Sequence, residues 1–150
     1  MKVKGANHTS YTVSDLERSK AFYCDILGCE LIWEREIEEQ YFRDIVVFSD
    51  CVVKAAFLRI PGSDHQLELF EYVHPRGDKQ DMNTNNPGNS HMAFVVDDLE
   101  EFYEELKAKG VTFKSEPVYI DYGRSKGAIA VYIVDPDGIT MELVEPAPQG

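Results

Sequence analysis

Four side chains of the kinds that bind divalent metal ions recur at matching places in the two halves of the chain. A histidine and a later glutamate occur in the first half, at His8 and Glu68, and the second half repeats them as His91 and Glu142. Two imidazoles and two carboxylates suit an octahedral or tetrahedral site for a first-row divalent ion, and the carboxylates neutralise its charge. We therefore predict that these four residues are ligands of one metal ion.

The matching places come from an internal repeat. Residues 8–17 read HTSYTVSDLE and residues 91–100 read HMAFVVDDLE, and LELFE at 67–71 resembles MELVE at 141–145. Repeated segments are expected to fold alike, so the two halves should share one order of elements. A unit of roughly 65 residues has a marginal core by itself. We therefore expect the two units to pair their sheets within a single domain.

Each half is predicted to fold as βαβββ, which gives an α+β protein. In the first half we expect a strand at 7–13, a helix at about 15–27 and strands near 29–36, 43–50, 52–59 and 66–72. Ser14 is the predicted N-cap, and Glu17 completes a capping box. In the second half we expect a strand at 90–96, a helix at about 98–109 and strands near 111–115, 128–134 and 139–145. Asp97 is the predicted cap there, with Glu100 in the capping-box place. The acidic run 34–39 is interpreted as a solvated hairpin, and 73–90 as a polar linker.

Strand alternation predicts which side chains share a face. His8, Ser10 and Thr12 lie together, and His91, Glu68 and Glu142 also face away from the helix of their own unit. Carboxylates on such a face need a partner or a metal, because burying them alone is costly. Glu71 and Glu145 fall on the opposite face and are expected to reach solvent at the rim of the sheet. His65 and His74 are expected to have surface roles.

Composition excludes several classes of protein. The formal net charge is −12, which opposes binding to nucleic acid and to anionic membranes, and no apolar stretch is long enough for a membrane helix. The three cysteines form no CxxC pair, which is typical of a reducing cytosol. We expect a cytoplasmic globular protein that acts on a small molecule.

The motifs in combination resemble the vicinal oxygen chelate superfamily, which is also called the glyoxalase/bleomycin resistance/dioxygenase superfamily. The stretches that carry the resemblance run from His8-Thr9 through Val13, Asp15-Leu16 and Arg18-Ser19 to Phe22-Tyr23 and Leu27-Gly28, and from His91 through Val96-Asp97-Asp98-Leu99, Lys109-Gly110-Val111 and Asp135-Pro136-Asp137-Gly138 to Glu142. The resemblance implies two βαβββ modules that form an open, cupped barrel around a divalent metal, often in a homodimer. It implies one domain over 1–150, with module 1 at about 5–73, a linker at 74–89 and module 2 at about 90–146.

The ligand pattern is similar to that of bacterial-type glyoxalase I, residue for residue at His8, Glu68, His91 and Glu142. The similarity implies Ni, Co or Zn, with Fe(II) or Mn as alternatives, and a lyase or isomerase reaction. In that reaction the metal polarises the substrate oxygens, and a carboxylate moves a proton at the carbon beside the carbonyl. Glu142 is the first candidate for this base and Glu68 the second.

Two departures from that enzyme argue against a glutathione adduct as substrate. Thr12 stands where bacterial glyoxalase I has an arginine that helps to bind glutathione, and Tyr72 stands where it has an asparagine. The candidate substrate-binding residues are Arg124, Lys126, Tyr72, Thr12 and Phe70, with Arg43 as a further anion-binding candidate and Trp33 as a further aromatic one. The loop 122–127 that holds Arg124 and Lys126 could close over the cup.

Two other functions remain open on the sequence. His8, His91 and Glu142 alone would form the 2-His-1-carboxylate triad of an Fe(II)-dependent, extradiol-type dioxygenase. Glu68 favours the non-redox reaction, because a fourth protein ligand takes a position that oxygen or substrate would need. A drug-binding protein of the bleomycin-resistance type would not need the four ligands. The substrate, and whether the site lies within one chain or across a dimer interface, stay open.

Overall fold

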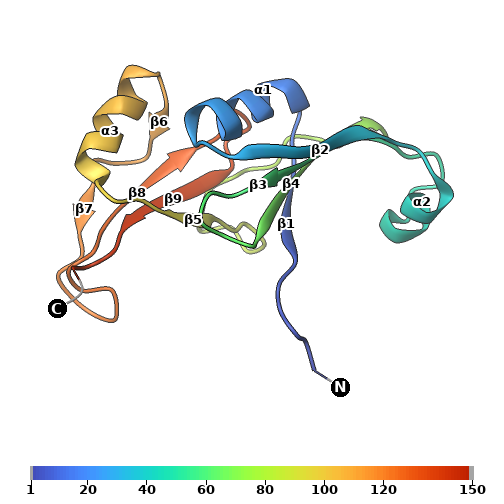
Figure 1. Cartoon of the computed structure of the whole chain (residues 1–150). Coiled ribbons are helices and arrows are strands. Elements are labelled where there is room, and N and C mark those ends of the chain that lie inside the picture. The colour runs from blue at the N-terminus through green and yellow to red at the C-terminus, as the bar shows by residue number, and fades with distance from the viewer. Residues whose placement is uncertain (1, 149–150) are drawn as a thin grey trace. The chain divides into compact units, whose positions relative to one another are not determined.

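The computed structural model describes residues 2–148, and the chain divides into two compact units. Unit 1 runs to Lys79 and unit 2 begins at Gln80. Each unit contains one mixed sheet with a helix packed on it (Figure 1). Within the described residues, no helix is long and apolar enough to cross a lipid bilayer.

Unit 1 has a four-stranded sheet in the order β1-β4-β3-β2. The β1/β4 pair is parallel and the other pairs are antiparallel. Its elements are β1 (His8–Thr12), α1 (Leu16–Lys20), which continues as a π-helical segment η1 (Ala21–Ile26), β2 (Glu30–Ile37), α2 (Gln40–Val46), β3 (Val52–Arg59) and β4 (Gln66–His74). Helix α1 lies against β3 and β4, and Leu16 on the helix and the cross-strand partners Leu58 and Leu67 are almost fully buried.

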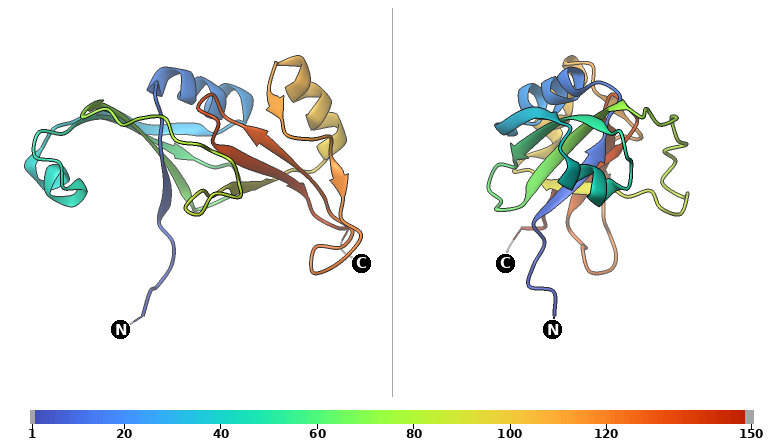
Figure 2. Two further views of the ribbon diagram at one scale, coloured as in Figure 1. Left: turned by 180° about the vertical axis from the view of Figure 1, so that it is seen from behind. Right: turned by 90° about the vertical axis from the view of Figure 1, so that its right-hand side faces the viewer.

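Unit 2 repeats this design with a sheet in the order β5-β9-β8-β6, in which β5 and β9 are parallel. Its elements are β5 (Met92–Val95), α3 (Leu99–Ala108), β6 (Thr112–Phe113), β7 (Val118–Tyr119), β8 (Ile129–Val134) and β9 (Thr140–Glu145). Helix α3 contacts β9 (Figure 2). Leu106 on the helix and Met141 and Leu143 on β9 are fully buried. The predicted α+β class with two βαβββ units is confirmed, although the short strand β7 was not expected.

Both helices begin one residue later than the predicted caps. Asp15 and Asp98 are the N-caps, with extended backbone, and not Ser14 and Asp97. The Asp15 carboxylate accepts a hydrogen bond from the Arg18 N–H, and that of Asp98 accepts one from the Glu101 N–H. An aspartate side chain has the length to reach the third helical N–H, so the second of two adjacent candidates takes the cap in both units.

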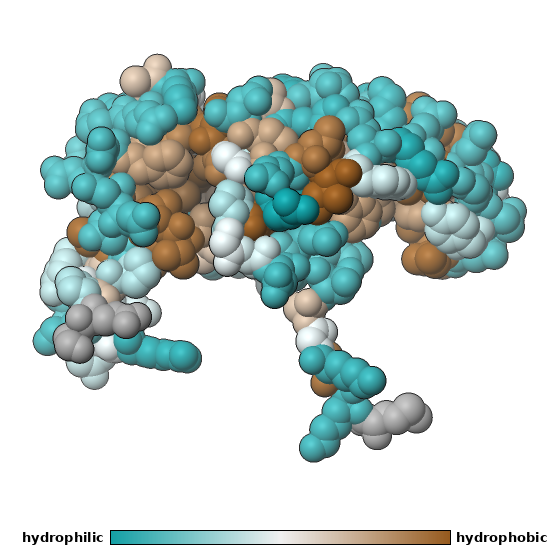
Figure 3. Space-filling view, in the orientation of Figure 1, coloured by the Kyte–Doolittle hydropathy of each residue, from teal (hydrophilic) through white to brown (hydrophobic). Residues whose placement is uncertain are grey.

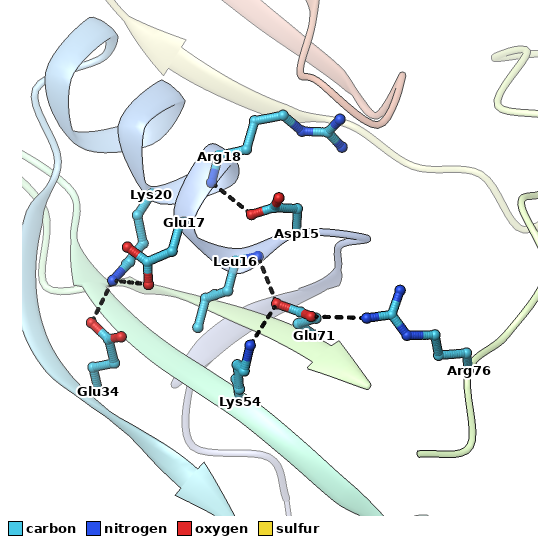
Figure 4. A network of polar contacts seen from close by, with 9 residues as sticks. All are labelled: Asp15, Leu16, Glu17, Arg18, Lys20, Glu34, Lys54, Glu71 and Arg76. Carbon is cyan, nitrogen blue, oxygen red and sulfur yellow. Dashed lines mark hydrogen bonds and ion pairs between the residues drawn. The ribbon is translucent and has the colours of Figure 1, made fainter. Parts of the chain in front are cut away.

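Glu71 and Glu145 complete these helix starts from the sheet. The prediction that they reach solvent was wrong for Glu71, which is buried, whereas Glu145 is half-buried. Glu71 is only 7% exposed and accepts a 3.0 Å hydrogen bond from the Leu16 N–H, while Arg76 and Lys54 approach its carboxylate (Figure 4). Glu145 accepts a 2.9 Å bond from the Leu99 N–H. The first N–H groups of a helix lack partners within the helix. Each unit therefore ties its helix to its last strand through one carboxylate.

The predicted strand at 43–50 was wrong, because helix α2 and a turn occupy this region. The run 34–39 is not a hairpin either, since β2 continues to Ile37, which pairs with Val53 and is buried. Helix α2 packs Phe42 against Phe70, with ring centroids 5.4 Å apart, and ends at Val47 in the left-handed conformation (φ 62°). In the described part of unit 2, residues 80–148, no helix corresponds to α2, so the repeat gave no indication of it.

Exposed apolar side chains gather at the part of unit 1 that carries α2. The space-filling view shows brown apolar surface beside this helix (Figure 3). Tyr41, Ile45, Val47 and Phe48 are all exposed, whereas Phe42 is buried and Val46 packs partly against the same small core. Helix α2 is therefore anchored to its sheet along one side only.

Candidate metal centre

The first pair of predicted ligands meets on the sheet of unit 1. Parallel pairing of β1 with β4 brings His8 next to Glu68, with 3.6 Å between His8 Nε2 and Glu68 Oε2. Glu68 is 6% exposed, and within residues 2–148 this contact is the only polar one its carboxylate makes. A separation of 3.6 Å is too long for a hydrogen bond. The pair is therefore close but not hydrogen-bonded, and the carboxylate keeps only a small access to solvent.

The ring of His8 is held in a defined orientation. Its Nδ1 lies 2.7 Å from the amide oxygen of Asn7, which accepts a hydrogen bond when that nitrogen carries the proton. The ring also packs edge-on against Phe57, with 5.6 Å between centroids. With Nδ1 engaged, the lone pair of Nε2 points to the side of Glu68. Histidine ligands of metals are commonly oriented by such a contact on the other ring nitrogen.

The second pair of predicted ligands meets in unit 2. His91, immediately before β5, has its Nε2 3.1 Å from Oε2 of Glu142 on β9. In this unit the pair is hydrogen-bonded, and the Glu142 side chain is more exposed than that of Glu68, 22% against 9%. Both histidine–glutamate pairs therefore form as the repeat predicted, one in each unit. Among the described residues no group of three or more His, Cys, Asp or Glu side chains could hold a metal ion, so each unit by itself offers two ligands.

Two aromatic neighbours of these pairs were not predicted. Phe57 on β3 is the cross-strand partner of Glu68, and Tyr132 on β8 is the cross-strand partner of Glu142. The Tyr132 ring lies 5.0 Å from the ring of His91. Burial raises the pKa of the Tyr132 phenol, and the nearby Glu142 carboxylate raises it further. The signal that could have found both residues is strand register, because each lies directly opposite a predicted ligand.

Three of the predicted substrate-binding residues adjoin the first pair. Phe70 and Tyr72 follow Glu68 on the same face of β4, and Thr12 is in register with Phe70. Phe42 and Phe48 pack edge-on against Phe70 and Tyr72, respectively. Burial raises the pKa of the Tyr72 phenol, and Cys51 and Glu68 raise it further. This end of the sheet is therefore aromatic, as the sequence predicted, and α2 adds to it.

The basic candidates are differently placed. Arg124 and Lys126 lie exposed in the loop between β7 and β8 of unit 2. Arg43 lies on α2, where its Nε donates a 3.2 Å hydrogen bond to the Cys51 carbonyl oxygen. Trp33 on β2 packs against Phe57 and lies beside the Arg35 guanidinium. The contacts of Arg43 are therefore those of a residue that closes the turn after α2.

Comparison with known protein families assigns the chain to one of them. The profile of the Glyoxalase/Bleomycin resistance protein/Dioxygenase superfamily matches residues 5–143. The chain belongs to this superfamily. The resemblance carried by the sequence motifs is thereby confirmed over nearly the whole chain.

Several members of known function or structure are similar to the chain. A 2-epi-5-epi-valiolone epimerase from an Actinomyces species is 31% identical over 142 residues, which cover 92% of this chain and 77% of the relative. A probable lactoylglutathione lyase from Synechocystis is 29% identical over 139 residues, 92% of each protein. The crystal structure of the fosfomycin resistance protein FosX from Listeria monocytogenes, in complex with Mn(II) and sulfate, has a TM-score of 0.65 at 24% identity and covers 97% of this chain and 95% of that one. The relatives therefore include an isomerase and a lyase, and a protein of the same fold binds a divalent metal.

Proposed function

We propose that the chain is a metal-dependent lyase or isomerase that moves a proton at a carbon next to a carbonyl group. His8, Glu68, His91 and Glu142 would hold one divalent ion, so that each unit supplies one imidazole and one carboxylate. The observation that carries the proposal is the buried carboxylate of Glu68, 3.6 Å from His8 Nε2 and without a hydrogen bond among the described residues.

The donor set fits a metal ion in type and spacing. Two donors that lie about 2.0–2.2 Å from one ion are roughly 3–3.5 Å apart when they subtend 90–110° at it. The His8–Glu68 and His91–Glu142 distances, 3.6 and 3.1 Å, are close to this range. An ion beside Glu68 would also compensate the cost of burying its charge. The Asn7 contact leaves His8 Nε2 as the nitrogen that is free to bind.

The two glutamates differ in a way that supports different roles. When bound, the ion would supply Lewis acidity to the oxygen atoms of the substrate. Glu142 is the more exposed carboxylate, and its Oε2 lies 3.1 Å from Nε2 of His91. We assign to Glu142 the removal of the proton beside the carbonyl and its return to the substrate. Glu68, buried and next to aromatic rings, would remain a fixed ligand.

The surroundings of Glu68 support a substrate other than a glutathione adduct. Thr12, Phe70 and Tyr72 provide no positive charge for a glutathione carboxylate, and the nearby rings of Phe42 and Phe48 favour an apolar part of the substrate. Arg124 and Lys126 would serve an anionic group from the exposed loop in unit 2. Ni, Co or Zn is the expected metal, with Mn or Fe(II) as alternatives. A small carbonyl compound is the expected substrate.

Metal content and reaction type test the proposal together. Protein purified without chelator is expected to contain one divalent ion per chain. When loaded with Ni or Co, it should exchange solvent deuterium into a ketone such as 2-epi-5-epi-valiolone under anaerobic conditions. The hemithioacetal of methylglyoxal and glutathione should exchange poorly. Turnover that needs Fe(II) and consumes oxygen would overturn the isomerase proposal in favour of a dioxygenase.

The Glu68→Gln variant tests the ligand set directly. It keeps the shape of the side chain and removes the charge, so cobalt affinity should fall at least tenfold while the fold is retained. Glu71→Gln is the matched control, because Glu71 lies on the same strand and faces the helix. Its cobalt affinity should equal that of the wild type. Full cobalt affinity in Glu68→Gln would show that Glu68 is not a ligand.

We further propose that the two modules act as one domain, in a cytoplasmic homodimer. The small core expected for a single unit supports pairing of the modules, as the repeat implied. Sedimentation at micromolar concentration should report twice the chain mass of 17.1 kDa. A monomer under these conditions would contradict the dimer.

A further inference from the structure

Tyr132 lies beside the second ligand pair, and its hydroxyl group makes no hydrogen bond to another described residue. Tyr132 is in register with Glu142 across β8 and β9, and its ring is 5.0 Å from the ring of His91. Within residues 2–148 the hydroxyl makes no hydrogen bond, although the residue is half-buried. A phenolic hydroxyl in a half-buried position usually finds a partner. Here the hydroxyl is not fully buried, so it is open to solvent or to a bound molecule beside the His91–Glu142 pair.

The same position in unit 1 shows that the hydroxyl is not needed for packing. Phe57 is in register with Glu68 as Tyr132 is with Glu142, and it packs on His8 as Tyr132 packs on His91. A phenyl ring is therefore sufficient to support a histidine in this repeated arrangement. Tyrosine differs from phenylalanine only by the hydroxyl group. The second unit thus carries an additional hydrogen-bond donor at an otherwise equivalent place.

We propose that the Tyr132 hydroxyl donates a hydrogen bond to an oxygen atom of the substrate next to the His91–Glu142 pair. This inference rests on the proposed function and adds a specificity-determining residue to it. A donor already in place stabilises negative charge that develops on such an oxygen. A site built to hydrogen-bond an oxygen also discriminates strongly against analogues that lack it.

The two histidine–glutamate pairs differ in the residues that surround their glutamates. Around Glu68 the cross-strand neighbours Phe57 and Trp33 are aromatic and offer no hydroxyl. Around Glu142 the corresponding neighbour offers one donor. The second unit therefore differs from the first by one hydrogen-bond donor beside its histidine–glutamate pair.

The test uses the full chain loaded with Co(II) and two small probes. Acetohydroxamate chelates through two oxygens and presents an acceptor to Tyr132. Imidazole binds through one nitrogen and offers no acceptor once bound. Titration calorimetry should show acetohydroxamate bound about 10- to 100-fold more weakly by Tyr132→Phe than by the wild type, because a hydrogen bond to a charged group is lost. Imidazole affinity and Co(II) affinity should not change.

Tyr119→Phe is the matched control, since Tyr119 on β7 pairs with Ile129, whose side chain points to the other face of the sheet. It should bind both probes like the wild type. Equal acetohydroxamate affinity in Tyr132→Phe and the wild type would overturn the inference and leave the proposed function intact. Tyr132→Phe could instead lose Co(II) affinity without a selective loss of acetohydroxamate affinity. That result would also overturn the inference, because Tyr132 would then act on Glu142. A wild-type protein that binds no Co(II) would overturn the proposed function, and this inference with it.

Discussion

Removal of the Glu71 carboxylate should be one of the most destabilising substitutions of a buried polar residue in unit 1. The Glu71 side chain joins the start of α1 to the end of β4, through the 3.0 Å hydrogen bond from the Leu16 N–H. Arg76 and Lys54 approach the same carboxylate at 3.3 and 3.8 Å. In Glu71→Ala the Leu16 N–H loses its partner in a buried place, and a gap remains between helix and sheet.

The magnitude follows from these contacts. A hydrogen bond to a charged group contributes about 1.5–3 kcal/mol to stability. Arg76 and Lys54 are well exposed, so their ion pairs with Glu71 add only about 0.2–1 kcal/mol each. We expect Glu71→Ala to lower the free energy of unfolding by about 2–4 kcal/mol. Glu71→Gln keeps an oxygen for the Leu16 N–H and should cost about 1 kcal/mol or less.

Urea denaturation followed by tryptophan fluorescence measures this effect in the right unit. Trp33 is the single tryptophan of the chain and lies on β2 of unit 1. With a urea dependence of about 1–3 kcal/mol per M, the midpoint of Glu71→Ala should fall by roughly 1–2 M or more. Glu145→Ala is the counterpart in unit 2, where far-UV circular dichroism should report a smaller loss, because the Leu99–Glu145 bond is only part-buried.

The order of the three variants is the part of the prediction that can fail. If Glu71→Ala changed the midpoint by less than the equivalent of about 0.5 kcal/mol, the carboxylate could not be the group that fixes the start of α1. A Glu71→Gln variant as unstable as Glu71→Ala would show that charge, and not the hydrogen bond to Leu16, carries the effect.

Two further predictions concern single residues of unit 1. Asn7→Ala removes the acceptor that orients His8 and should weaken Co(II) binding about 10- to 100-fold in a competition titration. The urea midpoint of the metal-free protein should not change. Unchanged Co(II) affinity would show that Asn7 has no role in metal binding. Val47→Gly relieves the left-handed backbone of an exposed β-branched residue and should raise the free energy of unfolding by about 0.5–1.5 kcal/mol. Val46→Gly, inside α2, should lower the free energy of unfolding. A lower urea midpoint for Val47→Gly would show that the backbone at Val47 is not strained.

The repeat made most of the fold predictable from the sequence. It places His8 and His91 at the first strand of each unit, and Glu68 and Glu142 at the last. Alternation then assigns their faces correctly, because a strand buried on one side must keep its apolar residues on that side. The parallel pairs β1/β4 and β5/β9 bring each histidine next to its glutamate. Local patterns were sufficient for these contacts because both units obey them.

The errors arose where a contact depends on residues far apart in sequence. Ser14 and Glu17 satisfy the capping-box pattern, but Asp15 and the distant Glu71 satisfy the N–H groups of α1. Residues 43–50 have apolar side chains that suit a strand. The chain is nevertheless helical from Gln40 to Val46, and Phe42 on this helix packs against Phe70 on β4. Propensity is a weak guide when one tertiary contact of this kind decides the outcome.

The two repeated units differ in the surroundings of their glutamates. A duplicated unit that kept identical surroundings for both glutamates would give them similar exposure and similar reactivity. Instead, Glu68 lies beside Phe57 and is buried, while Glu142 lies beside Tyr132 and is more exposed. A more exposed carboxylate is easier for a substrate carbon to reach than a buried one. Under the proposed function, this difference in exposure favours Glu142 over Glu68 as the base, and Tyr132 is the donor beside it.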